Sequence, residues 1–258
     1  MLNQQHNSNS NTPNSWLKVF ALSLCLVFCS HLFAQPTRIA VANNFALPLK
    51  NLLAESANAC AALHGKSACQ FTLSSGSTGK LYAQIINGAP FDIFFAADQH
   101  RPKLLLRHNP LYKLKTYTRG QIVLAGFQSV PSATSLGDEQ GRIAIANPKL
   151  APYGQAAIEF LQHQRLFNRL SNQLVYADNV GAAAAMLNSG SVNLAIIAKA
   201  QLLPNQAFWQ IPATTHQPIL QDVVLLTPNN VGAKYLFHYL STQQATQTLK
   251  RYGYLEAP

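Results

Sequence analysis

Short apolar runs alternate with stretches of helical periodicity along most of the chain. In the first part, apolar positions predict strands at residues 38–42, 70–74 and 91–96, and helices at 47–63 and 80–87. Strands that alternate with helices at these distances are typical of βαβ units. The strands are short and largely apolar, which indicates a parallel sheet covered by helices on both faces. We therefore expect an α/β fold.

The same pattern recurs in the second part of the chain. It predicts strands at 142–146, 174–177 and 192–197, and helices at 153–166 and 180–188. Stretches 117–126 and 221–227 are interpreted as strands that cross between two lobes, and a last helix is expected over 230–253. The expected division is residues 35–117 plus 228–258 for lobe 1 and 118–227 for lobe 2.

Four strand-to-helix loops should meet where the carboxyl ends of the strands face one another. None of them has a charged residue at the turn itself, and only Lys80 and Asp178 flank a turn. The clearest is "SSGSTGKLY", residues 74–82, whose small residues expose main-chain N–H groups at a helix start and favour an anion. It is not a nucleotide P-loop, because that motif requires glycine at position 74 and Ser or Thr at position 81. The loops are Asn43-Asn44, Ser77-Thr78, Pro152-Tyr153 and Asn179-Val180.

The N-terminal residues have the composition of a secretory signal. Residues 1–15 are rich in Asn, Gln and Ser, and residues 16–34 are mostly apolar. The apolar core, 19–28, is short for a bilayer span. We expect a signal peptide of residues 1–34, cleaved after Ala34, and a periplasmic location for the released protein; an uncleaved anchor is the alternative.

Removal of that signal changes both the cysteine count and the charge. Only Cys60 and Cys69 remain, and an even pair in an oxidising compartment predicts a disulfide between them. The net charge falls from +10 to +9, since Lys18 is the one charged residue of the segment. The basic residues are scattered and not interleaved with aromatics, so we expect no nucleic-acid partner.

Catalytic and metal-binding patterns are sparse. There is no G-x-S-x-G elbow and no H-E-x-x-H motif, and the histidines show no ligand spacing. Asp92 and Asp98 bracket a predicted strand and are the candidate carboxylates for an enzyme or a metal site. A structural role for Asp92 and a capping role for Asp98 in the following turn are favoured over catalysis. We expect no enzyme activity, no cofactor and no cation site.

Several segments resemble one family over nearly the whole chain, from about Arg38 to Tyr254. These are "SSGSTGKLYAQIINGAPFDIFFAADQHRPKLL", "IANPKLAPYGQAAIEFL", "YADNVGAAAAML" and the terminal "RYGY". They are similar to the periplasmic molybdate-binding proteins of ABC importers. The resemblance implies a class II periplasmic-binding-protein fold, with two α/β lobes and a ligand cleft between them. It also implies a monomer that binds molybdate or tungstate and delivers the anion to a membrane permease.

Transferred by position, the resemblance implies one set of oxyanion contacts. Some members of the family have a tyrosine where this chain has Ala198, and Tyr153 is expected to supply that hydroxyl. The implied contacts, which hold the molybdate or tungstate oxyanion without any cation, are Asn43, Asn44, Ser77, Thr78, Tyr153 and Val180.

The chemistry of the anion fits these residues independently. Molybdate is fully deprotonated near neutral pH, so a matching site offers hydrogen-bond donors only. Sulfate has the same acceptor pattern, and a receptor for sulfate or phosphate remains an alternative. Each residue also has a simpler explanation: Asn43-Asn44 and Ser77-Thr78 as helix caps, Tyr153 as a packing aromatic, and Val180 through its main chain alone.

Overall fold

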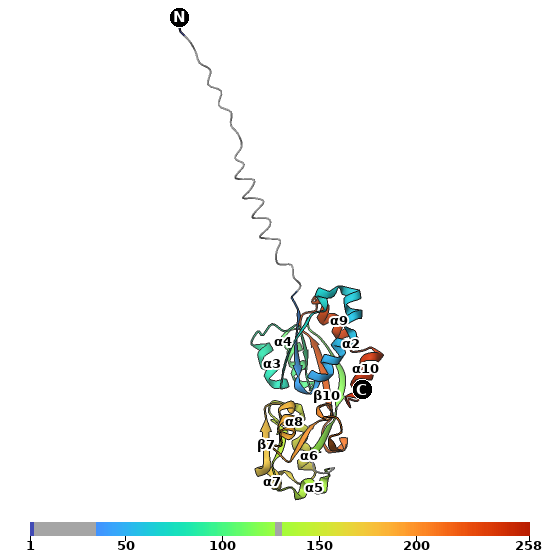
Figure 1. Cartoon of the computed structure of the whole chain (residues 1–258). Helices are drawn as coiled ribbons and strands as arrows, with labels where there is room; N and C mark the ends of the chain where they lie inside the picture. Colours follow the sequence, from blue (N-terminus) through green and yellow to red (C-terminus); the bar gives the residue numbers. More distant parts are fainter. Residues whose placement is uncertain (3–34, 127–130) are drawn as a thin grey trace. The chain divides into compact units, whose positions relative to one another are not determined.

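The computed structural model describes residues 1–2, 35–126 and 131–258. The chain divides into two compact units, Met1–Ala34 and Gln35–Pro258, and the second holds the elements discussed below (Figure 1). The predicted signal peptide lies outside the described residues apart from its first two positions. Among the described helices, none has the length and apolar character needed to cross a membrane.

The first lobe is built on a five-stranded sheet in the order β2-β1-β3-β10-β4. Strands β1, β2 and β3 are parallel, and β10 runs antiparallel to both β3 and β4. Its strands are β1 (Thr37–Ala42), β2 (Phe71–Gly76), β3 (Ile93–Phe95), β4 (Lys113–Gly120) and β10 (Ile219–Leu225). Its helices are α2 (Ala46–His64), α3 (Thr78–Ile86), α4 (His100–His108), α9 (Val231–Tyr239) and α10 (Gln243–Arg251).

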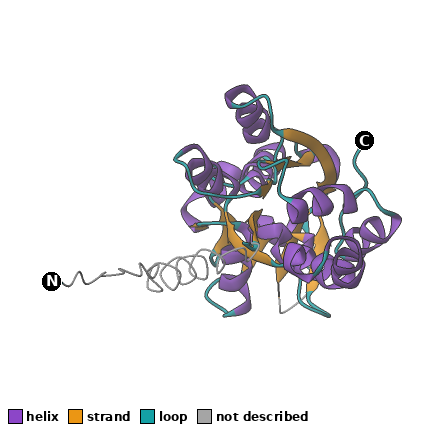
Figure 2. Cartoon of the chain, turned by 90° about the horizontal axis from the view of Figure 1, so that it is seen from above, coloured by secondary structure: helices purple, strands orange, loops and turns teal. Residues whose placement is uncertain are grey.

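The second lobe repeats this plan with the sheet order β7-β6-β8-β5-β9. Strands β6, β7 and β8 are parallel, and β5 runs antiparallel to β8 and β9. Seen from above, helices lie around the strands (Figure 2). The strands are β5 (Ile122–Gly126), β6 (Ile143–Ala146), β7 (Leu174–Ala177), β8 (Leu194–Ala198) and β9 (Ala207–Gln210). The helices are α5 (Ala133–Asp138), α6 (Pro152–His163), α7 (Phe167–Leu170) and α8 (Val180–Asn188).

The chain passes between the lobes twice, once within the predicted crossover stretch 117–126 and once before the predicted stretch 221–227, which lies largely in β10 of the first sheet. Gln121 alone separates β4 of the first sheet from β5 of the second, and residues 211–218 connect β9 to β10. Strand β10 pairs with β3 and β4 of the first sheet, so the chain has already returned to the first lobe before β10 begins. The expected lobe boundaries at 117/118 and 227/228 stay a prediction.

The prediction of a single last helix over residues 230–253 is wrong. Residues 230–253 form two helices, α9 and α10, because the hydroxyl of Thr242 accepts a hydrogen bond from Ala245 N at 3.2 Å and starts a new helix. Helices α4, α5 and α7 and strand β9 were not predicted. The sequence "HRPKLLLRH" of α4 is amphipathic but has only 9 residues, which is shorter than the window in which a helical period is read.

Buried aromatic side chains fix the turn that follows β1. Phe45 belongs to a 3₁₀ turn, Asn43–Phe45, and its side chain is fully buried. Its ring lies 5.4 Å from that of Phe95, 4.8 Å from that of Tyr117 and 5.7 Å from that of Tyr254, measured between centroids. The turn is therefore anchored from three other parts of the chain.

Two further predictions are confirmed in the first lobe. Cys60 and Cys69 form a disulfide that joins the last part of α2 to the end of the 3₁₀ turn Lys66–Cys69, which lies just before β2. The two candidate carboxylates have structural roles: Asp92 Oδ2 accepts from Arg38 N at 2.8 Å, and Asp98 Oδ1 accepts from Arg101 N at 3.1 Å.

Candidate functional site

Strand register places the predicted loops side by side within each lobe. In the first sheet Ala42 is paired with Gly76, so the turn after β1 lies next to the start of α3. In the second sheet Ala146 is paired with Ala177, so the starts of α6 and α8 are neighbours. Each lobe thus presents two adjacent strand-to-helix turns at the carboxyl edge of its sheet.

The two pairs of turns contact each other across the lobes. Gly79 N, in the first turn of α3, donates to Leu150 O at 2.9 Å. The Asn43 side chain lies so close to α8 that a Cβ at Gly181 would be 1.7 Å from its Oδ1. The structure therefore brings the six predicted residues to the surface along which the lobes meet. Their role in binding an oxyanion stays a prediction.

Five of these six residues are almost fully buried. The exposed fraction is 1% for Asn44 and Thr78, 2% for Tyr153, and 3% for Ser77 and Val180. Burial strengthens polar interactions and raises the cost of a polar group without a partner. The hydrogen bonds of these groups therefore indicate what the site can hold.

Three buried hydroxyl groups act as hydrogen-bond acceptors toward the protein. Ser77 Oγ accepts from Lys80 N at 3.4 Å, Thr78 Oγ1 accepts from Ala97 N at 3.1 Å, and the Tyr153 hydroxyl accepts from Gln221 Nε2 at 2.9 Å. Within the described residues, none of the three donates its hydrogen to a protein acceptor. Three donor hydrogens are thus available to a ligand.

Main-chain N–H groups at the helix starts add to these donors. In α3, Gly79 N and Lys80 N have partners, whereas Thr78 N has none among the described residues. In the same part of the structure Tyr153 N and Val180 N, in the first turns of α6 and α8, also have no partner. The positive end of each helix dipole lies at these groups.

Three residues outside the predicted set, Gln221, Tyr117 and Tyr254, form a buried network with Asn44 around Tyr153. Gln221 Oε1 accepts from Asn44 Nδ2 at 2.9 Å and from the Tyr117 hydroxyl at 3.1 Å. Asn44 Nδ2 also donates to the Tyr254 hydroxyl at 3.0 Å, which in turn donates to Asn44 O at 2.8 Å. The sequence carried two signals for this network: the polar Gln221 within the apolar run "ILQDVVL", and the terminal tyrosine of "RYGY".

Burial keeps the tyrosines of this network protonated. It raises the pKa of Tyr153 well above its ordinary value, an effect that the hydrogen bond from Gln221 partly opposes. Burial also raises the pKa values of Tyr117 and Tyr254, and the neighbouring Tyr153 adds to both increases. Their hydroxyl groups are therefore hydrogen-bond donors throughout the physiological pH range.

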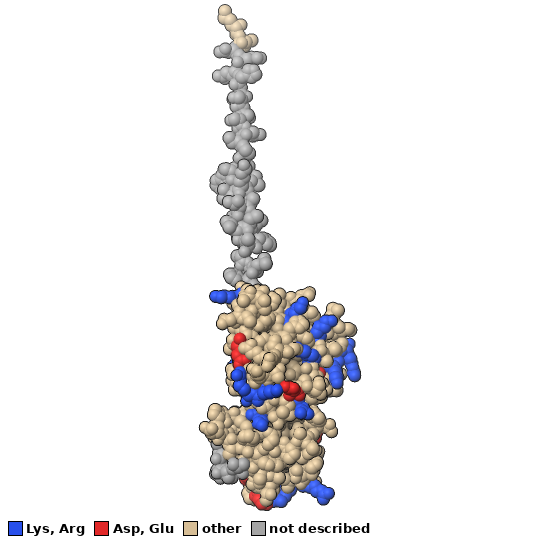
Figure 3. Space-filling view, turned by 90° about the vertical axis from the view of Figure 1, so that its right-hand side faces the viewer, with Lys and Arg blue, Asp and Glu red and all other residues tan. Residues whose placement is uncertain are grey.

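Charged side chains border the site without entering it. Arg101 forms an ion pair with Asp98, and its Nη2 donates to Lys149 O in the other lobe at 3.1 Å. Lys80 Nζ lies 2.8 Å from Asp178 Oδ2, also across the lobes. No Asp or Glu side chain forms a hydrogen bond with any of the six predicted residues in the described structure. The face in Figure 3 likewise shows charges dispersed among uncharged residues.

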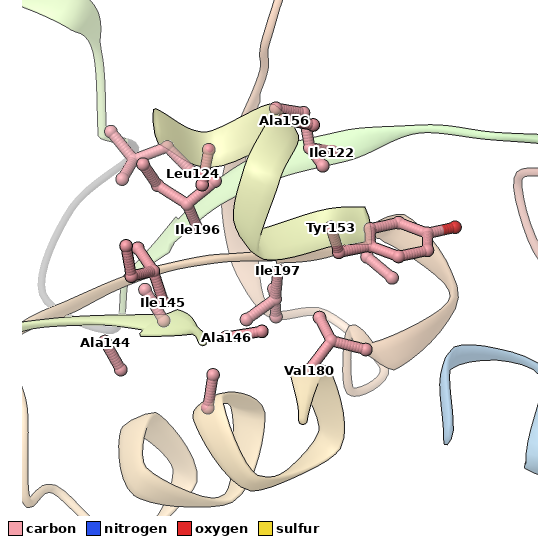
Figure 4. Close-up of a cluster of buried hydrophobic side chains, with 14 of the residues drawn as sticks. Ile122, Leu124, Ala144, Ile145, Ala146, Tyr153, Ala156, Val180, Ile196 and Ile197 are labelled. Atoms are coloured by element: carbon pink, nitrogen blue, oxygen red, sulfur yellow. The ribbon is translucent and has the colours of Figure 1, made fainter. Parts of the chain in front are cut away.

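Ala198 and Tyr153 are both buried in the second lobe, but only Tyr153 carries a hydroxyl group. Ala198 is fully buried at the end of β8 and carries no hydroxyl. Tyr153 and Val180 lie at the margin of the hydrophobic core, and the Tyr153 oxygen points away from the labelled apolar side chains (Figure 4). The hydroxyl lies beside Gly120, where a Cβ would be 2.1 Å away. One tyrosine thus projects from this lobe toward the first sheet.

Within residues 1–2, 35–126 and 131–258, no group of three or more His, Cys, Asp or Glu side chains could hold a metal ion. The polar groups that converge are instead neutral donors. Such a set binds an anion that has only acceptor atoms, with helix dipoles supplying part of the opposing charge.

Comparisons with known proteins agree with this chemistry. The model of the family described as bacterial extracellular solute-binding protein matches residues 37–255. The molybdate-binding protein of Azotobacter vinelandii is 32% identical over 249 residues, covering 92% of this chain and 96% of that protein. The molybdate-binding protein of Rhodobacter capsulatus is 31% identical over 254 residues, covering 93% and 96%.

A solved structure extends the likeness to three dimensions. The structure of the Azotobacter vinelandii periplasmic molybdate-binding protein matches with a TM-score of 0.76 and 30% identity, covering 86% of this chain and 99% of that one. The match confirms the expected two-lobed periplasmic-binding-protein fold. Together with the sequence relatives, it confirms the resemblance carried by the sequence motifs.

Proposed function

Because the chain belongs to the bacterial extracellular solute-binding protein family, we propose that it captures molybdate or tungstate between its lobes and delivers the anion to an ABC permease. The relatives that carry the name molybdate-binding protein span nearly the whole chain, which supports this ligand. In this proposal Asn43, Asn44, Ser77, Thr78, Tyr153 and Val180 form the oxyanion site.

The donor-only character of the site carries the proposal. The hydroxyl groups of Ser77, Thr78 and Tyr153 each accept from the protein and keep their hydrogens for a ligand. Molybdate and tungstate present acceptor oxygens alone, so every contact is favourable. Hydrogen phosphate also needs an acceptor for its proton, which this arrangement does not offer.

Sulfate is the second candidate, because it has the same acceptor pattern as molybdate. The size of the closed site then decides between the two anions, since molybdate and tungstate are larger. An enzyme on the same fold is the weaker alternative. Asp92 and Asp98, its candidate carboxylates, are engaged by Arg38 and Arg101.

Export and assembly belong to the same proposal. Residues 1–34 act as a signal peptide that directs the protein to the periplasm, where the oxidising environment maintains the Cys60–Cys69 bridge. The released protein works as a monomer without a cofactor. Its partners are the oxyanion and the membrane permease.

Thermal unfolding of the purified protein with molybdate, tungstate, sulfate or phosphate tests the ligand. A ligand present at a thousandfold excess over its dissociation constant stabilises the native state by about 4 kcal/mol, which raises Tm by about ten degrees. We expect this shift with molybdate and tungstate only. A comparable shift with sulfate would make the protein a general oxyanion receptor. No shift with any of the four anions would contradict the proposal.

A further inference from the structure

We infer that Gln221 is a positioning residue that turns the Tyr153 hydroxyl into a hydrogen-bond donor toward the bound oxyanion. The inference rests on the proposed function, because it assigns a role in the same site. Gln221 is fully buried in β10 of the first sheet, whereas Tyr153 begins α6 of the second lobe. The contact between them therefore spans the two lobes.

The amide of Gln221 is held in one orientation by two donors. Asn44 Nδ2 and the Tyr117 hydroxyl both direct hydrogens to Gln221 Oε1, at 2.9 and 3.1 Å. An amide nitrogen has hydrogens and no acceptor site, so Asn44 Nδ2 must face an oxygen. The oxygen of Gln221 is thus committed to the first lobe, and its Nε2 is left to face Tyr153.

This orientation decides the direction of the Tyr153 hydrogen. Gln221 Nε2 can only donate, and it lies 2.9 Å from the Tyr153 hydroxyl, so the phenol oxygen accepts. The other two hydroxyl hydrogens of the network are in use: Tyr117 donates to Gln221 and Tyr254 donates to Asn44 O. Among the described residues, the Tyr153 hydrogen has no protein acceptor. It remains available to the anion.

The consequence for binding follows from the dual nature of a phenol. A hydroxyl group can present either its hydrogen or its lone pairs to a ligand, and lone pairs repel an anion that only accepts. By donating to the phenol oxygen, Gln221 occupies a lone pair of Tyr153 and leaves the hydroxyl hydrogen to face the anion. Because it does so across the lobes, the donor becomes oriented only where the lobes meet, which couples closure to recognition.

The substitution Gln221→Glu reverses this arrangement while keeping the size of the side chain. One carboxylate oxygen can still accept from Asn44 and Tyr117, and the other accepts from Tyr153, so the tyrosine hydrogen turns toward residue 221. The anion then faces phenol lone pairs in addition to a new negative charge. We expect molybdate binding, measured by isothermal titration calorimetry, to weaken at least about 100-fold.

A double-mutant cycle with Tyr153→Phe separates hydrogen direction from charge and from general structural damage. In the wild-type background Tyr153→Phe should weaken molybdate binding about 10- to 100-fold, because a donor to a charged ligand is lost. In the Gln221→Glu background the same change should cost nothing or improve binding, since it removes misdirected lone pairs. The added charge is present in both arms of that second comparison and cancels.

Gln121→Glu provides the matched control. Gln121 lies at the crossing between the lobes and donates to Gly253 O, and among the described residues its side chain forms no hydrogen bond with Tyr153. In this background Tyr153→Phe should cost as much as in the wild type. An equal cost of Tyr153→Phe in the Gln221→Glu and Gln121→Glu backgrounds would overturn the inference. If the wild-type protein itself does not bind molybdate, the proposed function fails instead.

The wild-type protein offers a second measurement that needs no variant. With isotope-labelled tyrosine, NMR should show the Tyr153 hydroxyl proton shifting downfield and gaining protection from exchange when molybdate is added. The hydroxyl protons of Tyr117 and Tyr254, which already have protein acceptors, should change little. A Tyr153 hydroxyl signal that molybdate leaves unchanged would also overturn the inference.

Discussion

The two lobes supply similar donors to the candidate site but hold them in different ways. In the first lobe, Ser77 and Thr78 are fixed by main-chain N–H groups of the same lobe, Lys80 N and Ala97 N. In the second lobe, the Tyr153 hydroxyl is fixed by Gln221, which belongs to the sheet of the first lobe. One half of the site is thus preformed, and the other is completed by contact.

This difference assigns different tasks to the two halves. The preformed half in the first lobe loses little conformational entropy when the anion binds, because Ser77 and Thr78 are already held in place. This favours initial binding of the anion to the first lobe. The contact-dependent half in the second lobe, which contains Tyr153, is oriented only when the two lobes are in contact. It therefore favours the binding of ligands that allow the lobes to close. Variants that affect one half and not the other can test this division.

The largest effect is expected from Gly120→Ala. A Cβ there would lie 2.1 Å from the Tyr153 hydroxyl and 2.6 Å from Gln221 Nε2, so it displaces the contact-dependent half or keeps the lobes apart. We expect molybdate affinity to fall at least about 100-fold in a calorimetric titration. Gly137→Ala is the control, since its nearest neighbour is 3.8 Å away. A loss of less than about threefold would show that Tyr153 tolerates displacement.

Thr78→Val addresses the preformed half and should have the next largest effect. It removes one donor to the anion and leaves Ala97 N–H without its acceptor. We expect binding to weaken about 10- to 100-fold and the free energy of unfolding without ligand to fall by about 1–3 kcal/mol. Thr72→Val, at an exposed position of β2, is the control. Unchanged stability of the ligand-free protein would contradict the idea that this half is preformed.

The smallest effect is expected from Lys80→Gln, which removes the ion pair with Asp178 between the lobes. The side chains of both partners are exposed, 49% for Lys80 and 72% for Asp178, so water and salt screen the pair. Affinity should fall by no more than about threefold at low salt, and the difference should vanish near 0.5 M salt. A larger loss of affinity that persists at high salt would indicate that the Lys80–Asp178 pair, and not the buried network around Tyr153, holds the lobes together.

Local sequence was sufficient to predict the positions of the site loops. Asn44, Thr78 and Val180 follow strands whose apolar runs are clear, and small or capping residues mark the helix starts. The turns then come together through the parallel pairing of β1 with β2 and of β6 with β7, as an α/β pattern requires.

The network behind the site was beyond this kind of reasoning. Asn44 and Gln221 are 177 positions apart, and Asn44 and Tyr254 are 210 apart, so no local pattern relates them. Arg101 was missed because no helix was predicted over α4, whose 9 residues are fewer than a periodic pattern needs. The positions of the predicted ligand contacts follow from local strand-to-helix turns. The residues that orient those contacts come from distant parts of the chain, and their positions depend on how the strands pack.

The hydroxyl of Tyr254 also ties the start of the chain to its end. It donates to the main-chain oxygen of Asn44, 210 positions earlier. A chain emerging at about 5–20 residues per second needs at least about ten seconds to add those positions. During that interval Asn44 is present without the tyrosine that anchors it, and fragments that stop short of residue 254 lack the contact altogether. The order of synthesis therefore postpones a complete site until residue 254 has been added.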